Sequence, residues 1–169
     1  ILSQSAYFQM IGRKKEIEKI ERLLASGRSE FLAVTGRRRV GKTYLVDSLL
    51  KKHYCFSMTG IQNGSIATQL VNFSVKLAEY DGTNTPQKPE NWQLAFLQLK
   101  GYLKALPKEK KQVIFLDELP WVETPKSGFL QLLAHFWNDY LSKEPHFILV
   151  ICGSATSWIV KKVINDPGG

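Results

Sequence analysis

Two patterns of hydrophobic positions alternate along the chain: short continuous apolar runs, and longer stretches with apolar residues at helical spacing. The short runs are typical of strands buried on both faces of a parallel sheet, and the longer stretches predict amphipathic helices. The predicted strands cover residues 31–35, 54–58, 112–116 and 147–152. The predicted helices cover residues 14–26, 42–52, 64–79, 92–106, 127–142 and 155–164, with Gly27 as the stop of the first and Asn91 as the cap of the fourth.

Alternating strands and helices predict an α/β fold, a three-layer sandwich around a mostly parallel sheet. The clearest loop is residues 81–90, which contains Gly82, Pro86 and Pro89. The other linkers are too short to divide the chain. A chain of 169 residues is long enough to bury a core of its own, so we expect a single domain over residues 1–169.

The composition argues against a membrane protein. No run approaches the roughly 20 apolar residues that a spanning helix needs, and the first residues lack the layout of a secretory signal. Cys55 and Cys152 each lie inside a predicted strand, where a reduced core thiol is expected. These features predict a soluble, cytoplasmic protein with no membrane partner.

Basic residues outnumber acidic ones, with 23 Lys and Arg against 15 Asp and Glu and a formal net charge of +8. Such a balance attracts anionic partners, and nucleic acid is one of them. Three of these charges, Arg37, Arg38 and Arg39, lie beside a candidate phosphate site. The charge alone therefore leaves a nucleic-acid surface open.

The segment from Gly36 to Thr43, GRRRVGKT, matches the Walker A pattern and lies between a predicted strand and a predicted helix. An accidental glycine-containing turn is the alternative, and this placement argues against it. In such a loop the backbone N–H groups and the start of the helix face phosphate oxygens. We expect Lys42 to reach the β- and γ-phosphates and Thr43 to bind Mg²⁺. The predicted nucleotide-binding residues of this segment are Gly36, Arg37, Arg38, Arg39, Val40, Gly41, Lys42, Thr43 and Tyr44.

Adjacent carboxylates, Asp117 and Glu118, follow the third apolar run, as in a Walker B motif. Because side chains alternate at a strand end, we expect Asp117 to face Mg²⁺ and Glu118 to face an attacking water as general base. The alternative is an exposed acidic turn. A glutamate here favours hydrolysis over transfer to a small molecule. The chain has no Asn-Lys-x-Asp element that would read guanine, which favours ATP over GTP.

Ser154 follows the fourth predicted strand, at the strand end where ligands bind in open α/β sheets. It is a candidate for positioning phosphate or water, and capping of the next helix is the alternative. The histidines show no metal-ligand spacing and no arrangement typical of a hydrolytic triad. We therefore expect His53, His135 and His146 to have packing or surface roles.

Four segments resemble the AAA+ class of P-loop ATPases, specifically its archaeal and bacterial group described with the STAND branch. They are residues 11–16, 36–43, 115–121 and 152–158. The resemblance implies a sheet of order 5-1-4-3-2, and adenine contacts near Ile11, Gly12 and Arg13. It also implies a catalytic sensor position at Ser154, where typical members carry asparagine.

The resemblance further implies a fifth strand, a helical lid and a C-terminal region beyond Gly169, so we interpret the chain as a truncated ATPase core. The expected function is Mg²⁺-dependent ATP binding and hydrolysis coupled to conformational change. The alternative is a nucleotide-gated DNA-binding or protein-interaction module with little turnover. DNA or another protein, bound through the C-terminal region, and an oligomer that supplies an arginine finger are left open.

Overall fold

The computed structural model describes residues 13–37 and 39–153. Its four strands form one all-parallel sheet in the order β1-β4-β3-β2. This order agrees with the 1-4-3-2 portion of the predicted topology, and a fifth strand beside β1 stays a prediction. The strands are β1 (Glu30–Thr35), β2 (Tyr54–Thr59), β3 (Gln112–Asp117) and β4 (Phe147–Gly153).

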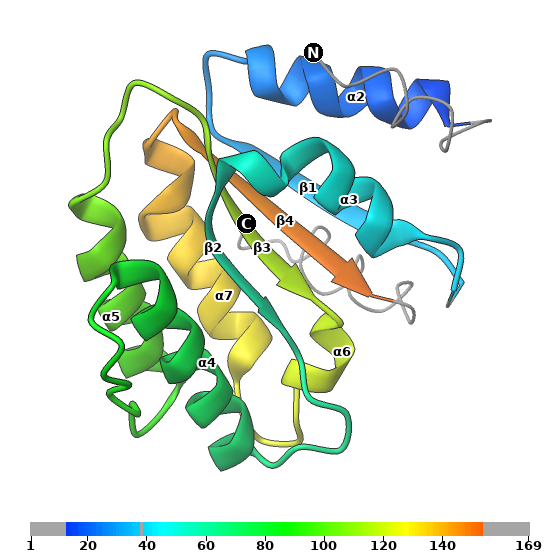
Figure 1. The fold of residues 1–169 in the computed structure, drawn as a ribbon. Helices are drawn as coiled ribbons and strands as arrows, with labels where there is room; N and C mark the ends of the chain where they lie inside the picture. The colour runs from blue at the N-terminus through cyan, green and yellow to red at the C-terminus, as the bar shows by residue number, and fades with distance from the viewer. Residues whose placement is uncertain (1–12, 38, 154–169) are drawn as a thin grey trace.

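Helices cover both faces of the sheet, which confirms the three-layer α/β architecture (Figure 1). Helices α2 and α3 lie on one face, and α4, α5 and α7 on the other. The helices are α2 (Lys14–Ala25), α3 (Lys42–Leu50), α4 (Ile66–Asp81), α5 (Trp92–Lys104), α6 (Leu119–Val122) and α7 (Phe129–Asp139). Short 3₁₀ turns follow α3 and α7 at Lys51–His53 and Leu141–Lys143.

Several predicted boundaries are wrong by a few residues. The first helix ends at Ala25, before the predicted stop at Gly27, because Ser26 adopts an extended backbone. The helix predicted from residue 64 starts at Ile66, because the Ser65 side chain accepts a hydrogen bond from the Thr68 N–H and caps it. The helices predicted to reach residues 52 and 142 end earlier, at Leu50 and Asp139, and 3₁₀ turns follow them, because helix ends often tighten into such turns.

Two hydrophobic clusters fill the space between the layers. The larger cluster joins α4, α5 and α7 to the sheet and is centred on aromatic rings, with Trp92 edge-on to Phe129 at 4.6 Å between ring centroids. The smaller cluster packs α2 and α3 onto the other face through residues such as Ile17 and Val46. Both clusters hold the sheet rigidly, so the strand ends form a fixed platform.

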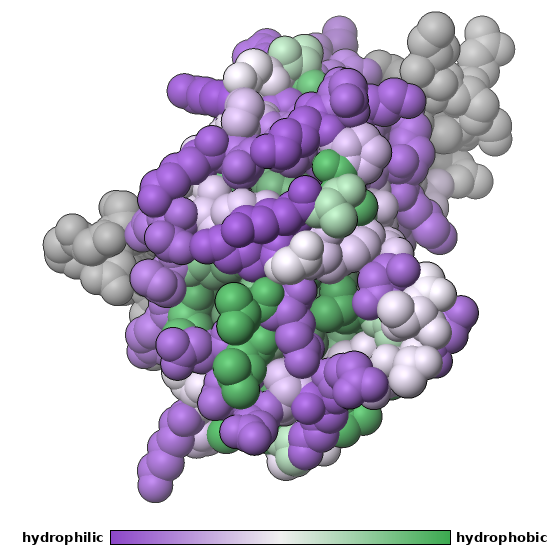
Figure 2. Space-filling view, turned by 90° about the vertical axis from the view of Figure 1, so that its left-hand side faces the viewer, coloured by the Kyte–Doolittle hydropathy of each residue, from purple (hydrophilic) through white to green (hydrophobic). Residues whose placement is uncertain are grey.

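The outer surface of α4 and α5 carries hydrophobic side chains among polar ones (Figure 2). The exposed large hydrophobic residues of these two helices are Val71, Val75, Leu94 and Leu97. In the described ranges, no helix is long and apolar enough to cross a bilayer. The helix predicted for residues 155–164 lies outside the described residues.

Candidate functional site

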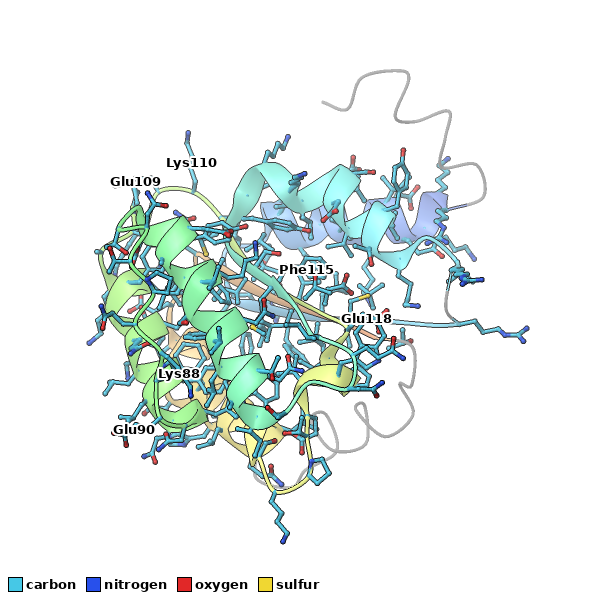
Figure 3. The ribbon with its side chains drawn as sticks, turned by 60° about the horizontal axis from the view of Figure 1, so that its bottom comes forward. Lys88, Glu90, Glu109, Lys110, Phe115 and Glu118 are labelled. Carbon is cyan, nitrogen blue, oxygen red and sulfur yellow. The ribbon has the colours of Figure 1, made fainter. Side chains whose placement is uncertain are left out.

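The strands run in parallel, so β1, β3 and β4 end at the same edge of the sheet, which we call the carboxyl edge. Thr35 of β1 pairs with Gly153 of β4, and Asp117 of β3 pairs with Thr59 of β2. The glycine-rich loop, residues 36–41, leaves β1 at this edge and leads into α3. Glu118 follows β3 at the same edge (Figure 3). The fold therefore brings together the two segments that the sequence singles out.

The glycine-rich loop has left-handed backbone at three of its described residues. Gly36 and Gly41 have φ of 144° and 75°, a region that residues with a side chain rarely adopt. Arg39 also has a positive φ, 61°. The Arg13 guanidinium donates a hydrogen bond to the Val40 carbonyl and so ties the start of α2 to the loop. The two motif glycines are thus required by backbone conformation.

Lys42, the first residue of α3, is turned back into the loop. Its ammonium group donates to the carbonyl oxygens of Gly36 at 2.9 Å and Arg37 at 2.7 Å. The residue is only 8% exposed. A lysine is seldom buried without partners, and these two carbonyl groups serve as partners for Lys42. This positive charge therefore lies at the centre of the loop, where an anion bound by the loop would meet it.

Thr43 and Asp117 meet across the carboxyl edge. The Thr43 hydroxyl donates to Asp117 Oδ2 at 2.9 Å, although the two residues are 74 positions apart. Asp117 is 5% exposed, and its other oxygen accepts the Glu118 N–H at 2.9 Å. A hydroxyl and a carboxylate are hard oxygen ligands of the kind that Mg²⁺ uses beside a nucleotide. The pair fits a magnesium ion.

The sequence predicted that alternation along the strand would direct the Glu118 side chain, and this reason is wrong. Glu118 lies beyond the end of β3, so its own backbone turn directs the side chain. Glu118 has φ of 46°, a left-handed conformation that costs a non-glycine residue about 1–3 kcal/mol. The turn leads into the short helix α6, which the sequence did not predict and which carries Pro120 near its start. Glu118 Oε2 is buried, and it has no hydrogen-bond partner among the described residues.

The Cys152 thiol lies next to Asp117. Burial, followed by the Asp117 carboxylate, raises the pKa of Cys152 to about 12, so the thiol is neutral at physiological pH. Burial also raises the pKa of Cys55 to about 12. Both cysteines are free and buried, which confirms their interpretation as reduced core thiols.

The remaining predicted site residues divide into two groups. Arg37, Arg39, Val40 and Tyr44 are exposed on or beside the glycine-rich loop. The other four, Ile11, Gly12, Arg38 and Ser154, lie outside the described residues. Within residues 13–37 and 39–153, no group of three or more His, Cys, Asp or Glu residues is arranged to hold a metal ion.

The sequence did not single out two residues that support the carboxyl edge, Gly60 and Gln69. The Gly60 N–H donates to the Asp117 carbonyl at 2.9 Å, and a Cβ on Gly60 would lie 2.7 Å from the Glu118 carbonyl oxygen. The Gln69 side chain hydrogen-bonds to backbone on both sides of this contact. The sequence could have indicated Gln69, because this polar residue interrupts the apolar stripe of its helix between Ile66 and Phe73. Gly60 had none, since a glycine after a strand is common.

A parallel sheet of this strand order, with a glycine-rich loop between β1 and α3, is typical of the P-loop NTPase fold. A family model described as an ATPase domain predominantly from Archaea matches residues 10–167. The chain belongs to this family of P-loop ATPases.

The chain is also similar to individual known proteins. The uncharacterized protein MJECL04 of Methanocaldococcus jannaschii is 24% identical over 155 residues, which cover 92% of this chain and 32% of the relative. The Walker-type ATPase PABY2304 of Pyrococcus abyssi superposes with a TM-score of 0.60 at 16% identity, over 95% of this chain and 50% of that one. A chain of Drosophila ORC bound to DNA has a TM-score of 0.55 at 14% identity, over 92% of this chain and 81% of that one. At these identities the structural likeness shows the fold. The chain spans about a third of the length of the archaeal relative.

Proposed function

We propose that the residues of the candidate site bind Mg·ATP and hydrolyse it, and that hydrolysis drives a conformational change in a longer protein. The observation that carries the proposal is the contact between Thr43 and Asp117 at 2.9 Å, which unites the glycine-rich loop with the end of β3. In P-loop NTPases a loop hydroxyl and a strand-end carboxylate hold the nucleotide-bound magnesium ion, and this contact brings two such groups together.

Each residue of the proposed site has a separate task. The loop N–H groups and the N-terminus of α3 would bind phosphate oxygens, and Lys42 would exchange its carbonyl partners for the β- and γ-phosphates. Thr43 and Asp117 would hold Mg²⁺, whose charge stabilises the oxygens of the transferred group. Binding by Ile11, Gly12, Arg13, Arg38 and Tyr44, and a sensor role for Ser154, are part of the same proposal.

Glu118 is the proposed general base. The oxygen of a water attacks the γ-phosphorus, the bond from that phosphorus to the β–γ bridging oxygen breaks, and a water proton passes to the Glu118 carboxylate. The buried Oε2 atom, with no partner among the described residues, supports this role because an unpaired carboxylate oxygen is free to accept a proton. Phosphate and ADP are the products.

The first test is thermal unfolding with and without Mg·ATP. A ligand at about 100 times its Kd stabilises the folded state by about 2.7 kcal/mol. For a domain of this size, that raises Tm by about 5–11 °C. We expect this rise in the wild type and its loss in Lys42→Ala. Lys76→Ala is the control and should keep the rise, because Lys76 is an exposed lysine on α4. No rise in the wild type at saturating nucleotide would contradict the proposal.

A nucleotide-gated DNA-binding or protein-interaction module with little turnover is the second proposal. It is supported by the formal net charge of +8, which attracts phosphate-rich partners. It is also consistent with the DNA-bound state of the Drosophila ORC structure. DNA or a protein partner, and an oligomer, would then be recognised by parts of a longer chain as well.

A further inference from the structure

A fully buried amide, Gln69 on α4, joins two segments of the carboxyl edge. Its Nε2 group donates to the Ile61 carbonyl at 2.7 Å and to the Trp121 carbonyl at 3.0 Å. Its Oε1 atom accepts the Ile61 N–H at 3.1 Å. Gln69 is 0% exposed. The amide thus uses both N–H donors and one acceptor position on backbone groups, so its burial is compensated.

The two segments held by Gln69 flank Asp117 and Glu118. Ile61 follows Gly60, whose N–H donates to the Asp117 carbonyl at 2.9 Å. On the other side, the Trp121 N–H donates to the Glu118 carbonyl at 2.9 Å. One side chain therefore connects the backbone before α4 with the backbone just after the paired carboxylates.

The turn at Glu118 needs such support. Its left-handed backbone is strained, and strained residues persist only where the surrounding structure determines their conformation. The following helix α6 has four residues, far too few to be stable without tertiary contacts. The bond from Gln69 to Trp121 is such a contact, and Gly60 lets the neighbouring backbone approach closely.

We propose that Gln69 is a positioning residue, which fixes α6 against the segment after β2 and so keeps the Glu118 carboxylate in place for hydrolysis. Gln69 touches no phosphate or metal ligand named above; it acts through Trp121 and Ile61. The proposal rests on the ATPase function, and it adds a determinant of turnover that is separate from nucleotide binding.

Substitution of Gln69 tests this role through the split between kcat and KM. Gln69→Leu keeps the volume close and removes all three hydrogen bonds. Misplacement of a catalytic group by a distant substitution lowers rates by about 10- to 100-fold. We expect kcat to fall by that factor, with KM for ATP and the Mg·ATP-induced rise in Tm unchanged.

Asn72→Ala is the matched control. Asn72 lies on the same helix and donates to the Thr59 carbonyl at 2.8 Å, so this hydrogen bond joins α4 to the end of β2 and does not involve α6. Its kcat should stay within about twofold of wild type, because single surface hydrogen bonds contribute little. An equal loss of kcat in Asn72→Ala and Gln69→Leu, or an unchanged kcat in Gln69→Leu, would overturn the proposal.

A second variant and a second measurement keep the proposal testable if Gln69→Leu unfolds or if the wild type does not hydrolyse ATP. In Gly64→Ala the new Cβ would lie 2.6 Å from Gln69 Nε2 and displace the amide while Gln69 remains. Amide hydrogen exchange at residues 118–122 should be faster in Gly64→Ala and Gln69→Leu than in Asn72→Ala. A wild type without turnover would refute the ATPase proposal alone, and unchanged exchange would refute the role of Gln69.

Discussion

At the scale of single residues, Glu118 combines a strained backbone with a buried carboxylate oxygen that lacks a hydrogen-bond partner in the described part of the chain. Each feature is unfavourable for stability, since strain and an unpaired buried polar atom both cost free energy. Asp117, one position earlier, has both carboxylate oxygens engaged. The contrast is consistent with the different roles proposed for the two carboxylates, metal binding for Asp117 and proton acceptance for Glu118.

Glu118→Gln should separate binding from turnover. The amide keeps the size of the side chain but cannot take up a proton, and loss of a general base lowers rates by about 10²- to 10⁴-fold. We expect kcat for ATP to fall by this factor while the Mg·ATP-induced rise in Tm persists, measured by phosphate release and thermal unfolding. Glu109→Gln is the control, because Glu109 is exposed and lies away from Glu118 (Figure 3). Unchanged turnover in Glu118→Gln would rule out Glu118 as the base.

At the scale of elements, α5 shows how one helix divides its residues between core and surface. Asn91 caps it by accepting the Leu94 N–H at 3.0 Å, as the sequence predicts. Leu99 is 1% exposed inside the larger cluster, whereas Leu97 is 63% exposed. Two leucines on one helix therefore make different contributions to the free energy of unfolding, because only one of them is removed from water.

Leu99→Ala should lower the free energy of unfolding by about 2–5 kcal/mol, since it leaves a cavity in a packed core. Leu97→Ala should change it by less than about 0.5 kcal/mol, because the side chain is already in solvent. Helix propensity favours alanine equally at both positions, so the pair isolates burial. Chemical denaturation of both variants measures the difference, and similar losses would show that the outer face of α5 is covered in solution.

At the scale of the whole molecule, the net charge of +8 bears on the second proposal. Exposed charges that are not neutralised by neighbours attract polyanions without regard to their sequence. Part of this charge, Arg37 and Arg39, lies exposed beside the glycine-rich loop. Nucleotide and nucleic acid would therefore compete for the same positive region if DNA bound there.

Binding to two duplexes of different sequence across a salt series tests this point. For purely electrostatic binding, log K falls against log salt with a slope of about −0.9 for each phosphate contacted. We expect equal affinities for both duplexes, a steep salt dependence, and weaker binding in the presence of Mg·ATP. Binding that survives high salt or prefers one duplex would indicate a dedicated DNA-reading surface and favour the second proposal.

Local patterns predicted much of this fold. Apolar runs and helical spacing located the four described strands and every described α-helix except α6. The reason is that the buried faces of strands and helices in a layered α/β fold produce periodic patterns of apolar residues. Boundaries were less accurate, since caps such as Ser65 and 3₁₀ turns such as Lys51–His53 depend on a few atoms. Segment α6 was missed because four residues are too short for any period to emerge.

The sequence by itself determined the class of fold and the two segments that the site is proposed to use, and its resemblance to known ATPases indicated the family. Local spacing encodes the fold class and the two segments: Gly36, Gly41, Lys42 and Thr43 form one motif, and Asp117 and Glu118 are neighbours. Only the tertiary structure decided the contact between Thr43 and Asp117, the left-handed turn at Glu118 and the three hydrogen bonds of Gln69. These features depend on groups far apart in the chain, whose geometry exists only once the helices and strands have packed.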